Sequence, residues 1–465
     1  MTSPRVRLSR QAVPSLLAAA LILPIAMVAT PFLARTAAAE TLTEALAKAY
    51  DNNPQLLAAR AQLRATDEGV PKALSGWRPT VTVNGDAGPA WSDTHPGGTA
   101  NYTPRSASLQ VTQPLYTGDR TSSAVRQAES LVLAQRSALS SVEQNVLLSA
   151  TTAYMDVVRA QAVLELNRKN EQVIARDLEA TRTRFEVGEL TKTDVAQAES
   201  RLAGATAARI QAEGQLESAR ATYAAVIGDK PGTLETPLPP TDLPGTQDET
   251  VAGSDNSPNV VAAQYNERAA RDGVDVAFSQ LLPSLALVGE ATTADETQQP
   301  GIDRDSASIL LQLTVPLYQA GAPESDVRQS KQVVGQRQQE LENERRTAVQ
   351  TAISAWQALA TARAQIKSFE SQVEAARVAL EGVRLEAEVG ARTVLDILDA
   401  EQEYLDAQVS LVGAKRDEVV ASYQVLSAVG RLTARDLALP VQYYDVESYY
   451  REVRNKFWGT GPSLQ

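Results

Sequence analysis

The residues that could do chemistry are few, and they do not form a catalytic group. His95 is the only histidine of the 465 residues and lies in a polar segment, and the chain contains no cysteine. A metal site needs several ligands that converge, so a lone loop histidine does not indicate one. No serine–histidine pair, cysteine nucleophile or glycine-rich phosphate loop is recognisable. The sequence therefore predicts a protein that is not an enzyme and needs no cofactor.

Two glycines each separate a long helical pattern from a shorter one. Gly188 and Gly390 hold the position just after a helix, where glycine is favoured because the backbone turns left-handed. A Thr-x-x-Asp motif follows each glycine and ends at Asp194 in the first case and at Asp396 in the second. This spacing matches the capping box that begins a helix. The sequence therefore predicts two equivalent helix–turn–helix units.

Three charged residues lie close together at the second turn. Arg392 precedes Asp396 by four residues and Asp399 follows it by three, so we expect their side chains on one helix face. In one interpretation the carboxylates only cap helices and Arg392 offsets them, an exposed contact contributing about 1 kcal/mol or less. In the other, an oligomer arranges Asp396 and Asp399 in rings around a pore. Such rings repel anions and bind cations, and pairing with Arg392 of a neighbouring copy would hold the pore shut.

Very long helices carry these turns. Residues 120–187 contain no proline, which corresponds to roughly 100 Å of helix at 1.5 Å per residue, and residues 326–389 are nearly as long. Apolar residues recur at alternating spacings of four and three, the pattern of a coiled coil. The second seam comprises Ala348, Ala352, Ala355, Leu359, Ala362, Ile366, Phe369, Val373, Ala376, Leu380, Val383 and Ala387. The first comprises Val146, Ala150, Ala153, Val157, Ala160, Leu164, Ile174, Leu178 and Phe185, with Asn167, Glu171 and Thr181 as polar exceptions.

The chain contains an internal repeat of about two hundred residues. Pro54 and Pro79 recur 204 residues later, whereas Tyr116 and Gly188 recur 202 residues later. We expect repeat 1 over 40–228, a linker rich in Pro, Gly, Thr and Asp over 229–257, and repeat 2 over 258–430. A C-terminal tail, 431–465, is expected to pack around the outside of the helices at mid-length.

Each repeat also contains two segments that alternate apolar and polar residues. They form predicted β-hairpins at about 79–114 and about 283–315, with polar loops over 92–104 and 295–304. A soluble β-sandwich is an alternative, but four strands embedded in helical sequence are too few for its core. Aromatic residues lie near both strand ends, as in the girdles of membrane strands. They are Trp77, Tyr116 and Tyr318 at one end and Trp91 at the other.

The N-terminus has the pattern of a secretory signal. Arg5, Arg7 and Arg10 precede an apolar stretch, and Ala37-Ala38-Ala39 forms an A-x-A cleavage site, so we expect a signal peptide over 1–39. Its removal takes away four arginines and no acidic residue, which moves the formal net charge from −12 to −16. Such a charge argues against nucleic acid as a partner.

Any membrane insertion must come from the strands. No later segment approaches about 18 consecutive apolar residues, so the sequence predicts no transmembrane helix. The other structure that spans a bilayer is a closed β-barrel. Because closed membrane barrels have at least about 8 strands, copies of the chain would have to pool theirs. Two copies would supply eight strands and three copies twelve.

These features together resemble the TolC-like outer-membrane factor family. The shared motifs are Asn53-Pro54, Pro-Leu-Tyr followed by Gly118 and by Gly321, Phe-x-Val-Gly ending at Gly188, and the segment 389–399. The resemblance implies a homotrimer with a twelve-stranded barrel of four strands per chain, continued by a periplasmic α-helical barrel. It implies location in the outer membrane of a Gram-negative bacterium, in contact with its lipid.

The resemblance also assigns residues and partners. It implies a periplasmic aperture formed by Asp194, Arg392, Asp396, Asp399 and Phe185, with cations as candidate ligands of the Asp396 and Asp399 rings. The family's aperture tyrosine corresponds here to Ala387. The turns at Gly188 and Gly390 would dock a periplasmic adaptor, which links the duct to an inner-membrane pump.

The function we expect is an export duct of a tripartite efflux pump or of a type I secretion system. An alternative is a periplasmic adaptor-like coiled-coil protein, a class that has one helical hairpin rather than two in tandem. A general porin would need eight or more strands per chain and no long helices. The sequence does not identify the cargo.

Overall fold

The computed structural model describes residues 39–297 and 301–461. The predicted signal peptide lies outside this range except for Ala39, as does the end of the predicted tail. The helices are α1 (Leu42–Asn52), α2 (Pro54–Asp67), α3 (Gly69–Leu74), α4 (Arg120–Glu186), α5 (Lys192–Ile227), α6 (Gln247–Gly253), α7 (Pro258–Phe278), α8 (Ala322–Glu388), α9 (Val394–Ala428) and α10 (Ser448–Val453). Short 3-10 turns are η1 (Ser75–Trp77), η2 (Ser254–Asn256) and η3 (Ser279–Leu281). The strands are β1 (Thr80–Ala87), β2 (Ala90–Thr94), β3 (Gly98–Tyr102), β4 (Arg105–Tyr116), β5 (Ser284–Asp295) and β6 (Asp303–Thr314).

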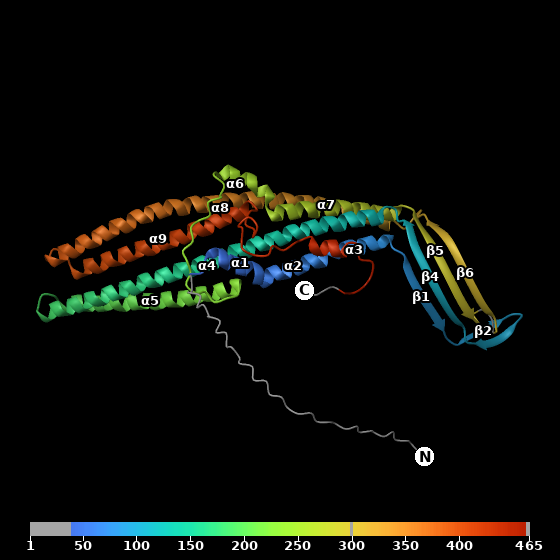
Figure 1. Ribbon diagram of the computed structural model, residues 1–465, viewed down its shortest axis with the longest axis horizontal. Coiled ribbons are helices and arrows are strands. Elements are labelled where there is room, and N and C mark those ends of the chain that lie inside the picture. The colour runs from blue at the N-terminus through green and yellow to red at the C-terminus, as the bar shows by residue number, and fades with distance from the viewer. Residues whose placement is uncertain (1–38, 298–300, 462–465) are drawn as a thin grey trace, which may run out of the picture. The chain divides into compact units, whose positions relative to one another are not determined.

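The internal repeat has a counterpart in the arrangement of the elements. Helices α4 and α8 each have 67 residues, and both their ends are 202 residues apart. Helices α2 and α7 both begin with proline, and strands β1 and β5 begin 204 residues apart. Each long helix packs against its return helix, α4 against α5 and α8 against α9, to form hairpin 1 and hairpin 2 (Figure 1). Within the described part, the hairpin turns lie at one end and the strands at the other (Figure 1).

The seam between paired helices is made largely of the residues expected from the heptad. Val146, Ala150, Ala153, Val157 and Leu164 are buried in α4, and Ala352, Ala355, Leu359, Ala362 and Leu380 in α8. Two polar exceptions are buried as well, because each is satisfied by its own helix. The Asn167 amide donates to the Val163 carbonyl at 2.8 Å, and the Thr181 hydroxyl donates to the Asp177 carbonyl at 2.7 Å.

Four antiparallel strands form the main sheet in the order β1-β4-β5-β6. The β4–β5 pair joins the two repeats, and β1 and β6 are the outer strands. Directly opposed residues divide the sheet into two faces, since side chains alternate along a strand. One face carries the polar row Thr82, Gln110, Glu290 and Ser308, and the other carries Val81, Val111, Gly289 and Ile309. Leu310 is an apolar exception on the polar face, where it lies opposite Val288.

The segment 92–104 differs from the sequence prediction of a polar loop. Strands β2 and β3 pair there as a separate two-stranded ribbon, with Ala90 opposite Tyr102 and Thr94 opposite Gly98. The prediction was wrong because the segment is polar on both faces, so it lacks the apolar alternation by which a half-buried strand is recognised. The predicted first strand is likewise divided, since β1 ends at Ala87 and β2 starts at Ala90.

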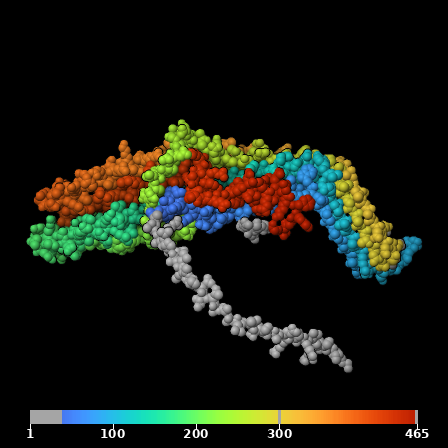
Figure 2. Space-filling model, in the orientation of Figure 1, coloured from blue at the N-terminus to red at the C-terminus, as the bar shows by residue number. Residues whose placement is uncertain are grey.

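The largest core lies around the middle of α4. Leu46 and Tyr50 of α1, Leu56 of α2, Tyr154 of α4 and Tyr223 of α5 are buried together there. Residues Leu432 and Leu439, beyond the end of α9, join the same core. Figure 2 shows the C-terminal residues, in red, gathered over the helices at mid-length. The segment 229–257, expected to be a linker, contains α6 and η2. None of the described helices is long and apolar enough to cross a membrane.

Candidate gate at the helical turns

Both hairpin turns are built on the same backbone motif. Gly188 and Gly390 have φ values of +83° and +77°, and no atom would meet an added Cβ, so backbone conformation alone favours glycine. The Gly188 amide donates to the Phe185 carbonyl at 3.0 Å, and the next amide donates to the Arg184 carbonyl at 2.9 Å. Equivalent bonds of 3.1 and 2.8 Å close the turn at Gly390. These paired bonds satisfy the last carbonyls of α4 and α8.

Asp194 and Asp396 both cap the returning helices, as the sequence predicts. At α5 the Asp194 carboxylate accepts from the Thr191 amide and from the Thr191 hydroxyl, both at 2.8 Å. At α9 the Asp396 carboxylate accepts from the Thr393 amide at 2.9 Å and from the Thr393 hydroxyl at 2.8 Å. Hydrogen bonds from the threonine backbone and hydroxyl lower the pKa of both carboxyls below the ordinary value. Both groups are therefore anionic at neutral pH.

Arg392 does not share a helix face with Asp396, so that prediction was wrong. Helix α9 begins only at Val394, which leaves Arg392 in the turn before the helix. Its Nε donates to Glu386 Oε2 of α8 at 2.8 Å, and this bond raises the pKa of the guanidinium. Arg392 thus bridges the turn to the end of α8, and its positive charge also helps to lower the pKa of the Asp396 carboxyl.

Asp399 pairs with a residue that the sequence reasoning missed. The Arg201 guanidinium of α5 donates to the Asp399 carboxylate of α9, which joins the two hairpins within one chain. The pair is not repeated, because the position equivalent to Asp399 is Gln197 and that equivalent to Arg201 is Glu403. The one sequence signal for this pair is that Arg201 and Asp399 carry opposite charges that their equivalents in the other repeat do not share.

An apolar contact accompanies this ion pair. Leu398 of α9 is 1% exposed and packs in one cluster with Ile174 and Leu178 of α4 and Ala198 and Ala205 of α5. The residue equivalent to Leu398 in hairpin 1 is Ala196, which is exposed. Hairpin 2 therefore inserts a side chain into the seam of hairpin 1, and Ala196 makes no equivalent buried contact among the described residues.

A second charged group lies one helical turn further along α9. The Arg384 guanidinium donates to Glu401, whose side chain is only 7% exposed. Burial raises the pKa of Glu401, and burial also raises the pKa of Asp177 on α4, since Arg384 compensates only part of the desolvation. The repeat equivalent in hairpin 1 is the ion pair Arg182–Glu199, in which Nη2 lies 2.6 Å from Oε1. Both side chains of this pair are half exposed.

A cavity lies between the hairpins, and the remaining predicted aperture residue, Phe185, is not among its lining residues. The cavity measures about 220 Å³ and is lined by Asp177, Thr181, Arg384, Ala387 and Leu398 among others. Ala387 is small enough to leave this space open. Phe185 lies at the end of α4 and is 42% exposed.

No candidate metal site is seen in the described part of the chain. Over residues 39–297 and 301–461, no three His, Asp or Glu side chains are grouped closely enough to hold a metal ion. His95 lies in the turn between β2 and β3, 3.9 Å from the Asp93 carboxylate.

The four aromatic residues predicted near the strand ends lie in different elements. Trp77 is in η1, Tyr116 ends β4, and Tyr318 lies between β6 and α8. Trp91 belongs to the separate ribbon, in β2. All four side chains are exposed in the single chain.

Comparison with known proteins identifies the family. The sequence matches the family described as "Outer membrane efflux protein" over residues 45–229 and 254–431. The chain belongs to this family. It is 37% identical over 431 residues to the outer membrane efflux protein BepC of Brucella suis, which covers 91% of this chain and 93% of BepC. It is 28% identical to the outer membrane protein TolC of Vibrio cholerae, over 86% of this chain and 92% of TolC.

Solved structures agree on the fold. The outer membrane channel CmeC of Campylobacter jejuni superimposes with a TM-score of 0.76 at 16% identity, covering 89% of each chain. VceC of Vibrio cholerae superimposes with a TM-score of 0.73 at 19% identity, over 84% of this chain and 96% of VceC. The predicted fold class, the family and the outer-membrane location are confirmed. As a member of this family, the chain is an outer-membrane export duct and not an enzyme.

Proposed function

We propose that three copies of this chain form one duct, in which the main sheets close a twelve-stranded barrel and the hairpins continue it as a helical tunnel. The observation that carries this proposal is the four-stranded sheet with one apolar and one polar face, bounded by β1 and β6 at its edges. Copies that pair these edges place an apolar surface toward lipid and a polar surface toward the lumen. Repeats 40–228 and 258–430, the linker and the C-terminal tail would then follow each other around the duct.

The hairpin turns are the proposed gate. Asp194 and Asp396 are held anionic at the start of α5 and α9, and three copies would place them in rings. Arg392 lies in the turn, from where it can exchange Glu386 for an Asp194 of a neighbouring copy. Asp399 is already neutralised by Arg201, so the Asp396 ring is the better candidate for binding cations.

Apolar side chains at the turns support docking of a second protein. Val187 is 69% exposed and Val389 is 80% exposed, each next to its turn glycine. An apolar side chain exposed beside each turn leaves apolar area that a second protein would cover on binding. We assign the turns at Gly188 and Gly390 to a periplasmic adaptor, which would connect the duct to an inner-membrane pump of an efflux or type I secretion system. Trp77, Trp91, Tyr116 and Tyr318 are the proposed contacts with the lipid interface.

Planar-bilayer recording of the purified mature protein tests the duct and the gate together. We expect discrete conductance steps, and we expect Arg392→Ala to increase the conductance because closure loses its cation. Arg182→Ala is the matched control, since it removes an ion pair of similar exposure that joins the two helices of hairpin 1. A protein that forms no pores would refute the duct. Pores with the same conductance in Arg392→Ala and wild type would refute only the assignment of the gate.

A further inference from the structure

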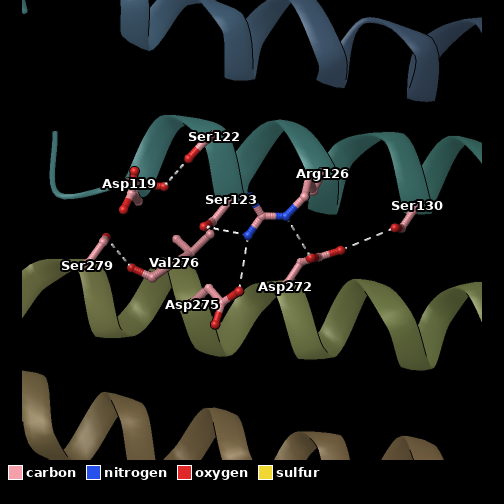
Figure 3. A network of polar contacts seen from close by, with 9 residues as sticks. All are labelled: Asp119, Ser122, Ser123, Arg126, Ser130, Asp272, Asp275, Val276 and Ser279. Carbon is pink, nitrogen blue, oxygen red and sulfur yellow. Dashed lines mark hydrogen bonds and ion pairs between the residues drawn. The ribbon is translucent and has the colours of Figure 1, made fainter. Parts of the chain in front are cut away.

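The two repeats of one chain are joined by a charged contact between α4 and α7. Arg126 Nε lies 3.3 Å from Asp272 Oδ1, and Arg126 Nη2 lies 3.1 Å from Asp275 Oδ2 (Figure 3). The same guanidinium donates to the Ser123 hydroxyl at 3.0 Å, and the Ser130 hydroxyl donates to Asp272 Oδ2 at 3.3 Å. One arginine of repeat 1 therefore organises the contact with repeat 2.

The repeat supplies a second copy of this contact in which the two sides do not meet. Adding 202 to Arg126 gives Arg328 on α8, and subtracting 204 from Asp272 gives Glu68 at the end of α2. Arg328 is exposed, and no hydrogen bond or ion pair to it is found among residues 39–297 and 301–461. Helix α8 makes no substantial contact with α2 or α3 in the chain, whereas α4 packs along α7.

Glu68 retains the capacity to accept a further bond. The Tyr449 hydroxyl of the tail donates to Glu68 Oε1 at 2.7 Å, and the Glu68 side chain is exposed. Its second oxygen accepts no hydrogen bond from the described residues. Of the two acidic partners of Arg126, only Asp272 has an acidic equivalent, because Pro71 stands at the position equivalent to Asp275.

The sheet leads to the same pairing independently. Strand β4 of repeat 1 pairs with β5 of repeat 2, with Gln110 opposite Glu290. The equivalent strands are β6 and β1, which are the unpaired outer strands of the sheet. Applying the same offsets places Gln312 opposite Asp86. Both lie on the polar face, so the derived register keeps the faces of the sheet continuous.

We infer that, where β6 and α8 of one copy meet β1 and the α2–α3 segment of the next, Arg328 pairs with Glu68 and Gln312 lies opposite Asp86. This inference rests on the proposed function, which already pairs the outer strands, and adds to it the register and the charged pair by which copies meet. The occupant is a second copy of the same chain because the chain already uses this contact once, between its own repeats. The two faces differ, so copies add head to tail and a ring closes the series.

Paired cysteines test the register, since the chain contains no cysteine of its own. Directly opposed strand residues have Cα atoms about 4.5–5.5 Å apart, within the range that a disulfide bridges. We expect mild oxidation of Asp86→Cys/Gln312→Cys to link copies into covalent dimers and trimers on a non-reducing gel. The control Asp86→Cys/Leu313→Cys is slipped by one residue, which places the two thiols on opposite faces, and should stay uncrosslinked.

Charge reversal tests the helix contact. Arg328→Glu and Glu68→Arg should each raise the dissociation constant of the interface between copies about five-fold in detergent. The double variant should restore assembly. Tyr449→Phe removes only the contact within the chain and should leave assembly unchanged.

The outcomes separate this inference from the proposed duct. Assembled, conducting protein in which the aligned cysteines fail to crosslink, or in which the slipped pair crosslinks equally, would overturn the inferred interface alone. Failure of the double charge variant to recover would also count against the Arg328–Glu68 pair. A wild-type protein that stays monomeric in detergent and forms no pores would overturn both proposals.

Discussion

Asp67 is a buried carboxyl without a hydrogen bond. Its side chain is fully enclosed at the end of α2, and neither oxygen accepts a hydrogen bond from the described residues. The pKa of this carboxyl is raised to about 6, mainly by burial. The charge of Glu68 adds to the rise, and the charge of Arg136 opposes it. The folded protein therefore favours the protonated form of Asp67 more strongly than the unfolded chain does.

The shift predicts how stability depends on pH. A raised carboxyl pKa means that the folded state binds the proton more tightly, so stability falls as pH rises from 3.8 to about 6 and stays lower above that range. Asp67→Asn should remove this dependence and stabilise the protein at pH 7 by about 1–3 kcal/mol. Thermal unfolding at pH 5 and pH 7.5 measures the effect. Asp51→Asn, at an exposed position of α1, is the control, and an equal gain there would contradict the explanation.

The Arg201–Asp399 pair gives a second prediction at this scale. Arg201→Gln leaves the Asp399 carboxylate without its cation, so we expect a stronger block of conductance by divalent cations added on the side of the turns. The exchanged pair Arg201→Asp/Asp399→Arg should return the block toward the wild-type level. If the exchange and the single variant behave alike, the two residues do not act as a pair.

Local spacing explains which site residues the sequence could identify. Asp194 and Asp396 were recognised because a capping box lies within four residues of chain. Arg201 was missed because its partner is almost two hundred residues away, and nothing in the local pattern of α5 marks it. The face shared by Arg392 and Asp396 was wrongly inferred because helical spacing was extended past the residue at which α9 begins.

At the scale of elements, the hairpins are held together by shape as much as by charge. Leu398 enters the seam of hairpin 1. Its neighbours along α9 form ion pairs, Asp399 with α5 and Glu401 with α8. We expect Leu398→Ala to cost about 2–4 kcal/mol of hairpin packing and to increase leak conductance through the closed duct. Leu395→Ala, at an exposed position on the same helix, is the matched control. An unchanged leak in Leu398→Ala would show that this contact does not hold the hairpins.

Elements with strong periodicity were the most predictable. The sequence places the long helices within a few residues of their observed ends, because proline-free periodic segments are closed by the turn glycines Gly188 and Gly390. The β2–β3 ribbon was missed, since a strand pair that is exposed on both faces has no apolar alternation. The short α6 was missed because seven residues carry too few turns for a helical period to be seen.

At the scale of the whole molecule, charge is the property with a direct functional consequence. The chain without residues 1–39 has a formal net charge of −16, and the carboxylates at the turns are held ionised. We predict a cation-selective pore, measured as the reversal potential across a salt gradient. The selectivity should weaken near 1 M salt, where the Debye length falls to about 3 Å. A pore that prefers anions would contradict the assignment of the turn carboxylates to the conduction path.

The ion pair that occurs in both repeats has different surroundings in each. Arg182 and Glu199 remain in contact with solvent, whereas the side chain of Glu401, the partner of Arg384, is enclosed. Loss of Arg384 would leave the buried Glu401 carboxylate without a compensating charge, whereas loss of Arg182 or Glu199 leaves a charge that water can solvate. Descendants of this gene should thus drift freely at the former pair and change little at the latter, so that a duplication that began symmetric becomes steadily less so.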